Sequence, residues 1–221
     1  MKFITTRIVS ANPHWVTLAM VAAVSLMGHG PASAQQTCGD GREGLKVNYT
    51  DPKDAAILNN INNNHFNSDV QNLRRGETGM IEGDLDYVLR NAPNHHRGLY
   101  VMSQYHLRER TEKFEHETYS MICWFERAMR FAPTDAVVPM IYGIYLHKRT
   151  NMAEAERQYK HALDLAPDFA EAHYNLGLLY VDWKRFDDAV THAHEAYRLG
   201  YPLPGLRDKL VAVGAWKAQT P

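Results

Sequence analysis

The chain has 221 residues, and its 24 Lys and Arg residues nearly balance its 25 Asp and Glu residues, giving a formal net charge of −1. Without a strongly basic stripe, the sequence argues against a protein that binds the phosphate backbone of nucleic acid. After residue 34 it contains no phosphate-binding loop, nucleophile motif or Gly-rich dinucleotide fingerprint, so we predict no catalytic residues and no cofactor.

Residues 1–34 are expected to be a cleaved signal peptide. Lys2 and Arg7 give a basic start, residues 15–27 form an apolar run, and small residues at 32–34 offer a cleavage site. The apolar run is shorter than the ~20 residues that a membrane-spanning helix needs. We therefore expect a periplasmic or secreted protein with no stable membrane insertion after cleavage.

Residues 35–59 are expected to be an irregular N-terminal arm, because their first half is rich in Gly, Asp and Thr and has no clear periodicity. Residues 60–93 follow a 34-residue frame with poor fidelity. Gly76 falls at a turn in this frame, and apolar residues recur at helical spacing from Ile81 to Val88. This segment is predicted to be a degenerate helical pair.

Residues 94–133 fit the same 34-residue frame with a surplus of 40 − 34 = 6 residues. The surplus fits best between the two helices of the pair, around residues 110–117. In that frame Ser103, Met121 and Ala128 occupy the positions that small residues hold in the later copies.

Residues 134–167 and 168–201 contain one pattern twice. A shift of 34 residues places Gly143 on Gly177 and aligns alanines with alanines further along. Apolar residues recur in steps of three and four on both sides of a polar break, which predicts two helices joined by a tight turn. The small residues would let neighbouring helix axes approach closely.

Two helix starts carry a capping-box pattern, in which an N-terminal side chain and a Glu three residues later close the first turn. They are Asn151 with Glu154 and Asp168 with Glu171.

At the C-terminal end of the chain, residues 202–221 are predicted to be a capping helix and tail. A terminal repeat needs such a lid over its apolar face, and Leu206, Leu210, Val213 and Trp216 form an apolar stripe there.

The 34-residue pattern resembles that of the tetratricopeptide repeat (TPR) family. The segment AEAHYNLGLLYVDWKRFDDAVTHAHEAYRLGYP, Ala170 to Pro202, matches closely except at His173, where Trp is usual, and Ala136 to Pro167 also fits. The resemblance implies an all-α, right-handed α-solenoid of about four helical pairs plus a C-terminal capping helix. Segments within residues 83–100 also look like those of exported bacterial repeat proteins.

The resemblance implies a non-catalytic interaction or scaffolding module that binds a peptide or segment of another envelope protein in a concave groove. The first helix of each pair would line that groove. The residues expected to face it are Arg97, Tyr100, Gln104, Arg108, Met140, Ile144, His147, Lys148, Glu171, Tyr174, Leu178, Val181 and Asp182. This set lacks the Lys and Asn combination by which some family members clamp a terminal carboxylate. A groove that holds no ligand is the alternative.

A metal-handling or enzymatic envelope protein is the competing hypothesis, because histidines gather around His95, His96 and His106. Adjacent residues on a helix point about 100° apart, so His95 and His96 cannot chelate one ion by themselves. No His-x-x-x-His or Cys-x-x-Cys spacing occurs. Structural or surface histidines are favoured, and no metal site is predicted.

Cys38 and Cys123 are the only two cysteines of the chain, and an oxidising compartment would let them pair. In the repeat frame, Cys123 and Trp124 occupy positions that normally face water. Their presence there suggests that another segment covers them, and the arm after Cys38 is the nearest candidate. We predict a disulfide, with a buried free thiol at Cys123 as the alternative.

Overall fold

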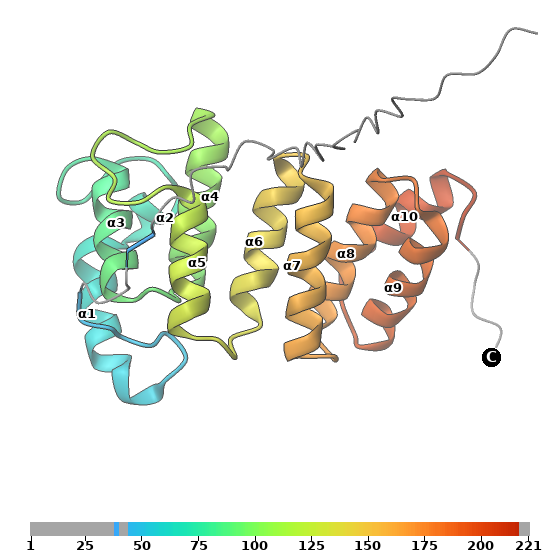
Figure 1. The fold of residues 1–221 in the computed structure, drawn as a ribbon, viewed down its shortest axis with the longest axis horizontal. Coiled ribbons are helices and arrows are strands. Elements are labelled where there is room, and N and C mark those ends of the chain that lie inside the picture. Colours follow the sequence, from blue (N-terminus) through green and yellow to red (C-terminus); the bar gives the residue numbers. More distant parts are fainter. Residues whose placement is uncertain (1–37, 40–43, 217–221) are drawn as a thin grey trace, which may run out of the picture. The chain divides into compact units, whose positions relative to one another are not determined.

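A computed structural model describes residues 38–39 and 44–216 (Figure 1), and the expected signal peptide lies outside them. These residues contain no strand, which confirms the predicted all-α fold. None of the described helices has the length and apolar composition that crossing a membrane requires. The helices are η1 (Pro52–Asp54), α1 (Ala55–His65), α2 (Ser68–Gln71), α3 (Ile81–Asn91), α4 (His96–Glu109), α5 (Met121–Phe131), α6 (Val137–Lys148), α7 (Met152–Leu165), α8 (Ala170–Asp182), α9 (Phe186–Arg198) and α10 (Gly205–Ala212).

The helices pack as successive pairs. Helix α1 contacts α3, α4 contacts α5, α6 contacts α7, and α8 contacts α9. The pairs follow one another along the chain (Figure 1), and the first helices of the last three pairs form a row, because α6 contacts both α4 and α8. Helix α10 packs against α8 and α9 as the expected cap. The row of α4, α6 and α8 positions the candidate site.

Glycine lets neighbouring helices approach closely at two equivalent positions. A Cβ atom on Gly143 would lie 2.6 Å from the ring of Tyr159 in α7, and one on Gly177 would lie 2.5 Å from Leu206 in α10. Both distances are well below the ~3.5–4 Å at which carbon atoms pack. The alanines predicted to face neighbouring helices are fully buried: Ala155, Ala162, Ala189 and Ala196. The prediction that small residues set the helix spacing is confirmed.

The first helical pair begins earlier than predicted, since η1 and α1 make residues 52–59 helical where an irregular arm is expected from the sequence. The Asp51 carboxylate starts this segment by accepting a hydrogen bond from the Lys53 N–H at 2.9 Å. The described part of the arm before η1, residues 38–39 and 44–51, has no regular structure but is held in place. The Val47 N–H donates to the Asn91 carbonyl at 2.8 Å, and the Val47 side chain is fully buried.

Neither predicted capping box forms. Asn151 is the N-cap residue of α7, but its side chain makes no cap hydrogen bond, and Glu154 accepts a hydrogen bond from Gln158 instead. Helix α8 has Phe169 as its N-cap residue, one position after the Asp that the box requires. The carboxylate of Glu171 in its first turn therefore does not cap the helix.

The insertion in the second pair lies between its helices, as predicted, because α4 ends at Glu109 and α5 begins at Met121. Glu117 in this connection is buried. Its carboxylate accepts a hydrogen bond from Trp124 Nε1 at 2.7 Å and lies 3.0 Å from His106 Nε2. The connection therefore folds back onto its own helical pair.

The capping helix is shorter than predicted, since α10 ends at Ala212. Its residues Leu206 and Leu210 are fully buried, whereas Val213 lies beyond the end of the helix and is exposed. The ring of Trp216 packs against the ring of His194, with centroids 4.6 Å apart. The end of the predicted tail, residues 217–221, lies outside the described residues.

Candidate functional site

The first helices of three successive pairs, α4, α6 and α8, line a cavity of about 550 Å³. Its helical lining residues lie in the N-terminal halves of these helices, except Ile144, which lies just past the middle of α6. Six of the residues predicted to face a groove are among them: Arg97, Tyr100, Met140, Ile144, Glu171 and Tyr174.

The other predicted groove residues do not reach this cavity, because they lie nearer the C-terminal ends of the same helices: Gln104, Arg108, His147, Lys148, Leu178, Val181 and Asp182. Some of them bind each other or their surroundings instead. The Asp182 carboxylate lies 3.0 Å from His147 Nε2 and accepts a hydrogen bond from Lys209 at 3.1 Å. The Arg108 guanidinium donates to the Leu73 carbonyl at 3.0 Å. The cavity therefore extends over a shorter length of the helices than the predicted groove.

Residues outside the helices complete the cavity wall. Tyr49 comes from the N-terminal arm, and Tyr201 and Leu203 come from the connection between α9 and α10. The Tyr49 N–H donates to Asn94 Oδ1 at 3.0 Å, and its ring lies 4.7 Å from that of His96. These residues could not be assigned to the groove from the repeat frame, because it assigns faces only to helical positions. Tyrosines in segments beside the predicted groove were the one available signal.

Two side chains of opposite charge line the cavity, Arg97 of α4 and Glu171 of α8. Neither makes an ion pair or a side-chain hydrogen bond with any other residue that the structure describes. Glu171 is half-buried, and this burial raises the pKa of its carboxyl group. Arg97 is exposed, and its guanidinium lies 5.9 Å from the centre of the Tyr100 ring. The two charges therefore differ in how far water can reach them.

The cavity has an apolar floor and an aromatic side. Met140 and Ile141 of α6 are almost fully buried in the floor. On the α8 side, the rings of Tyr174 and Tyr201 lie 4.3 Å apart. Burial, and then the negative charge of Glu171, raise the pKa of Tyr201 to about 12, so this phenol stays neutral at physiological pH. The arrangement suits a ligand that brings both apolar and charged groups.

The histidines considered as metal ligands make hydrogen bonds within the protein. His95 Nδ1 accepts a hydrogen bond from the Gly98 N–H, and its Nε2 lies 2.9 Å from Asn62 Oδ1. His96 Nε2 lies 2.7 Å from the Asp135 carboxylate. In the described part of the chain, no three His, Cys, Asp or Glu side chains are grouped so that they could hold a metal ion.

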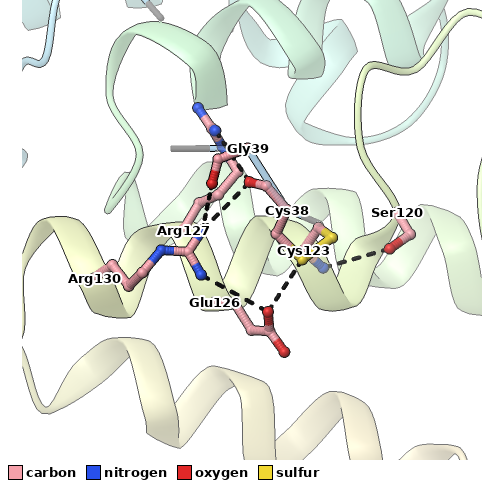
Figure 2. Close-up of a disulfide and its surroundings, with 7 residues drawn as sticks. All are labelled: Cys38, Gly39, Ser120, Cys123, Glu126, Arg127 and Arg130. Atoms are coloured by element: carbon pink, nitrogen blue, oxygen red, sulfur yellow. Dashed lines mark hydrogen bonds and ion pairs between the residues drawn. A yellow bond between two sulfur atoms is a disulfide. The ribbon is translucent and has the colours of Figure 1, made fainter. Parts of the chain in front are cut away.

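Cys38 and Cys123 form a disulfide, which attaches the arm to α5 (Figure 2). Arg127 and Arg130 reach from the same helix and donate hydrogen bonds to the Cys38 carbonyl at 3.4 Å and 3.3 Å (Figure 2). Cys123 and Trp124 are both 1% exposed, so they are covered, as predicted. The arm is only part of that cover, because the connection between α4 and α5 supplies the hydrogen-bond partner of Trp124.

Comparisons with known proteins identify a repeat motif in part of the chain. No curated protein sequence matches the chain. The crystal structure of a thermophilic TPR protein from Thermus thermophilus is 18% identical, with a TM-score of 0.49, over 74% of this chain and 78% of that chain. Residues 146–182 match a family model described as TPR repeat. The segment from the end of α6 through α8 therefore carries the sequence pattern of a TPR repeat, within an all-α fold of stacked helical pairs.

Proposed function

We propose that the protein is a non-catalytic binding module that takes a peptide or protein segment into the cavity between α4, α6 and α8. The cavity of about 550 Å³ carries this proposal, because three successive pairs contribute apolar and aromatic side chains to one concave surface. Its volume falls in the range of ligand-binding pockets, ~300–1,000 Å³. Interfaces of this kind draw most of their energy from a few such anchors.

Tyr100 and Ile144 are the anchors best placed to contact a bound segment. Tyr100 is 37% exposed and Ile144 is half-buried, so both keep surface that a ligand can cover. Tyr174 serves the fold instead, because it is buried and its hydroxyl would lie 3.0 Å from a Cβ atom on Gly205 in α10. Truncating Tyr174 would therefore disturb the packing of α8 against the cap.

The proposed place of action is the cell envelope, after export. The signal-peptide pattern of residues 1–34 supports this proposal, and so does the disulfide, since disulfides persist in oxidising compartments. N-terminal sequencing of protein recovered from the cell envelope tests it, and we expect the mature chain to begin near Gln35. Recovery of the chain with Met1 still attached would contradict export by cleavage.

Binding is tested with the double variant Tyr100→Ala/Ile144→Ala and fluorescent pools of random nonapeptides, blocked at both ends. We expect the wild-type protein to bind these pools and the double variant to lose at least about tenfold in affinity, because hot-spot truncations cost about 2 kcal/mol or more. Ile122→Ala is the control, since Ile122 is exposed on α5 and does not line the cavity. Equal binding by all three proteins, with equal melting temperatures, would place the site elsewhere.

A further inference from the structure

We propose that the cavity selects segments that carry a lysine or arginine side chain, which pairs with Glu171. This inference rests on the proposed function, because it requires that a peptide segment enter the cavity. Many segments would fit the apolar floor, and Glu171 would determine which of them bind most tightly.

The carboxylate of Glu171 is half-buried in the cavity wall and has no ion-pair partner among the residues that the structure describes. Burying a charge without a partner is costly, and burial accordingly raises the pKa of this group. The folded protein already bears this cost before any ligand arrives. A cation that enters the cavity would therefore gain an attraction for which little further desolvation of Glu171 is needed.

Another partly buried carboxylate, Glu156 of α7, shows the usual arrangement. It accepts hydrogen bonds from the Tyr180 hydroxyl at 2.7 Å and from Arg185 at 3.0 Å. Burial alone would raise its pKa, but the hydrogen bonds from Tyr180 and two cationic side chains lower it to about 2. Glu171 lacks such partners among the residues that the structure describes, so a cation from a ligand can fill that place.

Aromatic rings beside Glu171 favour the same kind of ligand group. Tyr201 lies close enough for the negative charge of Glu171 to contribute to its raised pKa, and its ring packs against that of Tyr174. Ammonium and guanidinium groups are attracted to the faces of such rings when they lie within ~6 Å. A carboxylate next to two tyrosine rings therefore suits a basic side chain better than a polar uncharged one.

Arg97 makes a run of basic residues a poorer ligand than a single one. Its guanidinium lines the cavity on the α4 side without an ion-pair partner in the described part of the chain. A second cation near Arg97 would be repelled, whereas backbone carbonyls or an acidic side chain of the segment would be attracted. The floor of Met140 and Ile141 would remain uncovered by a small cation alone. The favoured ligand is a peptide segment with one basic residue among apolar ones.

The test uses pools of end-blocked random nonapeptides that differ at the central position, which is Lys, Arg, norleucine or Glu. Fluorescence anisotropy with the purified wild-type protein should show about tenfold tighter binding of the Lys and Arg pools than of the norleucine pool, and the Glu pool should bind weakest. In Glu171→Gln this preference should disappear. Glu115→Gln removes the same charge from an exposed position between α4 and α5 and should keep the preference.

Each other outcome overturns a stated part of the proposal. If the wild-type protein binds the norleucine and Lys pools equally, or Glu171→Gln keeps the preference, the role of Glu171 is wrong while segment binding stands. If the wild-type protein binds none of the pools, segment binding falls as well. If acetyl-lysine amide binds as tightly as the Lys pool, the site takes a small cation and not a peptide segment. The wild-type comparison can overturn the proposal even if Glu171→Gln fails to fold.

Discussion

At the scale of single residues, His95 makes the stability of the fold depend on pH. It is the N-cap residue of α4, where Nδ1 accepts a hydrogen bond from the Gly98 N–H at 2.9 Å. Burial lowers the pKa of His95 to about 4, from an ordinary value of 6.5. Because Nδ1 must be unprotonated to accept this bond, protonation of the ring opposes the cap.

We predict that the free energy of unfolding falls as the pH decreases from about 6.5 to about 4. Between these values the unfolded state binds more protons than the folded one, so stability is complete above the unfolded pKa and declines towards the folded pKa. Urea unfolding at several pH values measures the slope. His95→Asn keeps an N-cap acceptor that does not titrate, so its slope should be smaller. A slope equal to that of the wild-type protein would show that His95 is not responsible.

A second residue-scale prediction concerns the glycines. Gly143→Ala should lower the free energy of unfolding by about 1–3 kcal/mol, because the new Cβ atom would meet the ring of the fully buried Tyr159. Gly83→Ala, in helix α3, is the control. A Cβ atom at this position would meet no neighbouring atom within 4 Å. It should stabilise the protein by about 0.5–1 kcal/mol. Urea unfolding of both variants checks this pair, and shifts of the same sign would contradict the assigned packing.

At the scale of elements, the disulfide fixes a segment outside the repeats to α5. Its cysteines are 85 residues apart, and closing a loop of this length stabilises by about 4–5 kcal/mol in the chain-entropy model, before any strain is subtracted. We predict that Cys38→Ala/Cys123→Ala unfolds at a markedly lower urea concentration than the wild-type protein. Reductant should shift the wild-type midpoint similarly and leave that of the double variant unchanged. An equal midpoint for the oxidised protein and the double variant would rule out this stabilisation.

Helices could be predicted from the sequence where their signal is local. The repeated glycines Gly143 and Gly177 indicated the close helix contacts, because a Cβ atom at either position would lie within 2.6 Å of a neighbouring side chain. The capping boxes failed because the same short pattern suits a Glu with another partner, as for Glu154, or one in a cavity wall, as for Glu171. Tyr49 could not be placed because its position depends on the distant Asn94.

At the scale of the whole described chain, the cavity depends on neighbouring pairs and not on one helix. Stability in repeat proteins is approximately a sum of repeat and nearest-neighbour terms. A ligand that touches α4, α6 and α8 together would bind only while both intervening contacts are intact, and would therefore stabilise both. Part of the predicted groove could be placed from the sequence because these first helices recur in register. The end of the groove nearest the C-termini of these helices could not be predicted, because there His147 and Asp182 bind each other.

The attachment of the arm to α5 also sets an order of events during biosynthesis. A chain is made from its N-terminus, so Cys38 emerges first and must wait for a partner 85 residues later. Tyr49 lies between the two cysteines in the sequence and contributes to the cavity wall. The wall is therefore secured covalently only after α1 to α4 and the start of α5 have been made and the thiols oxidised. A newly made chain passes through a reduced form whose cavity wall lacks this covalent support.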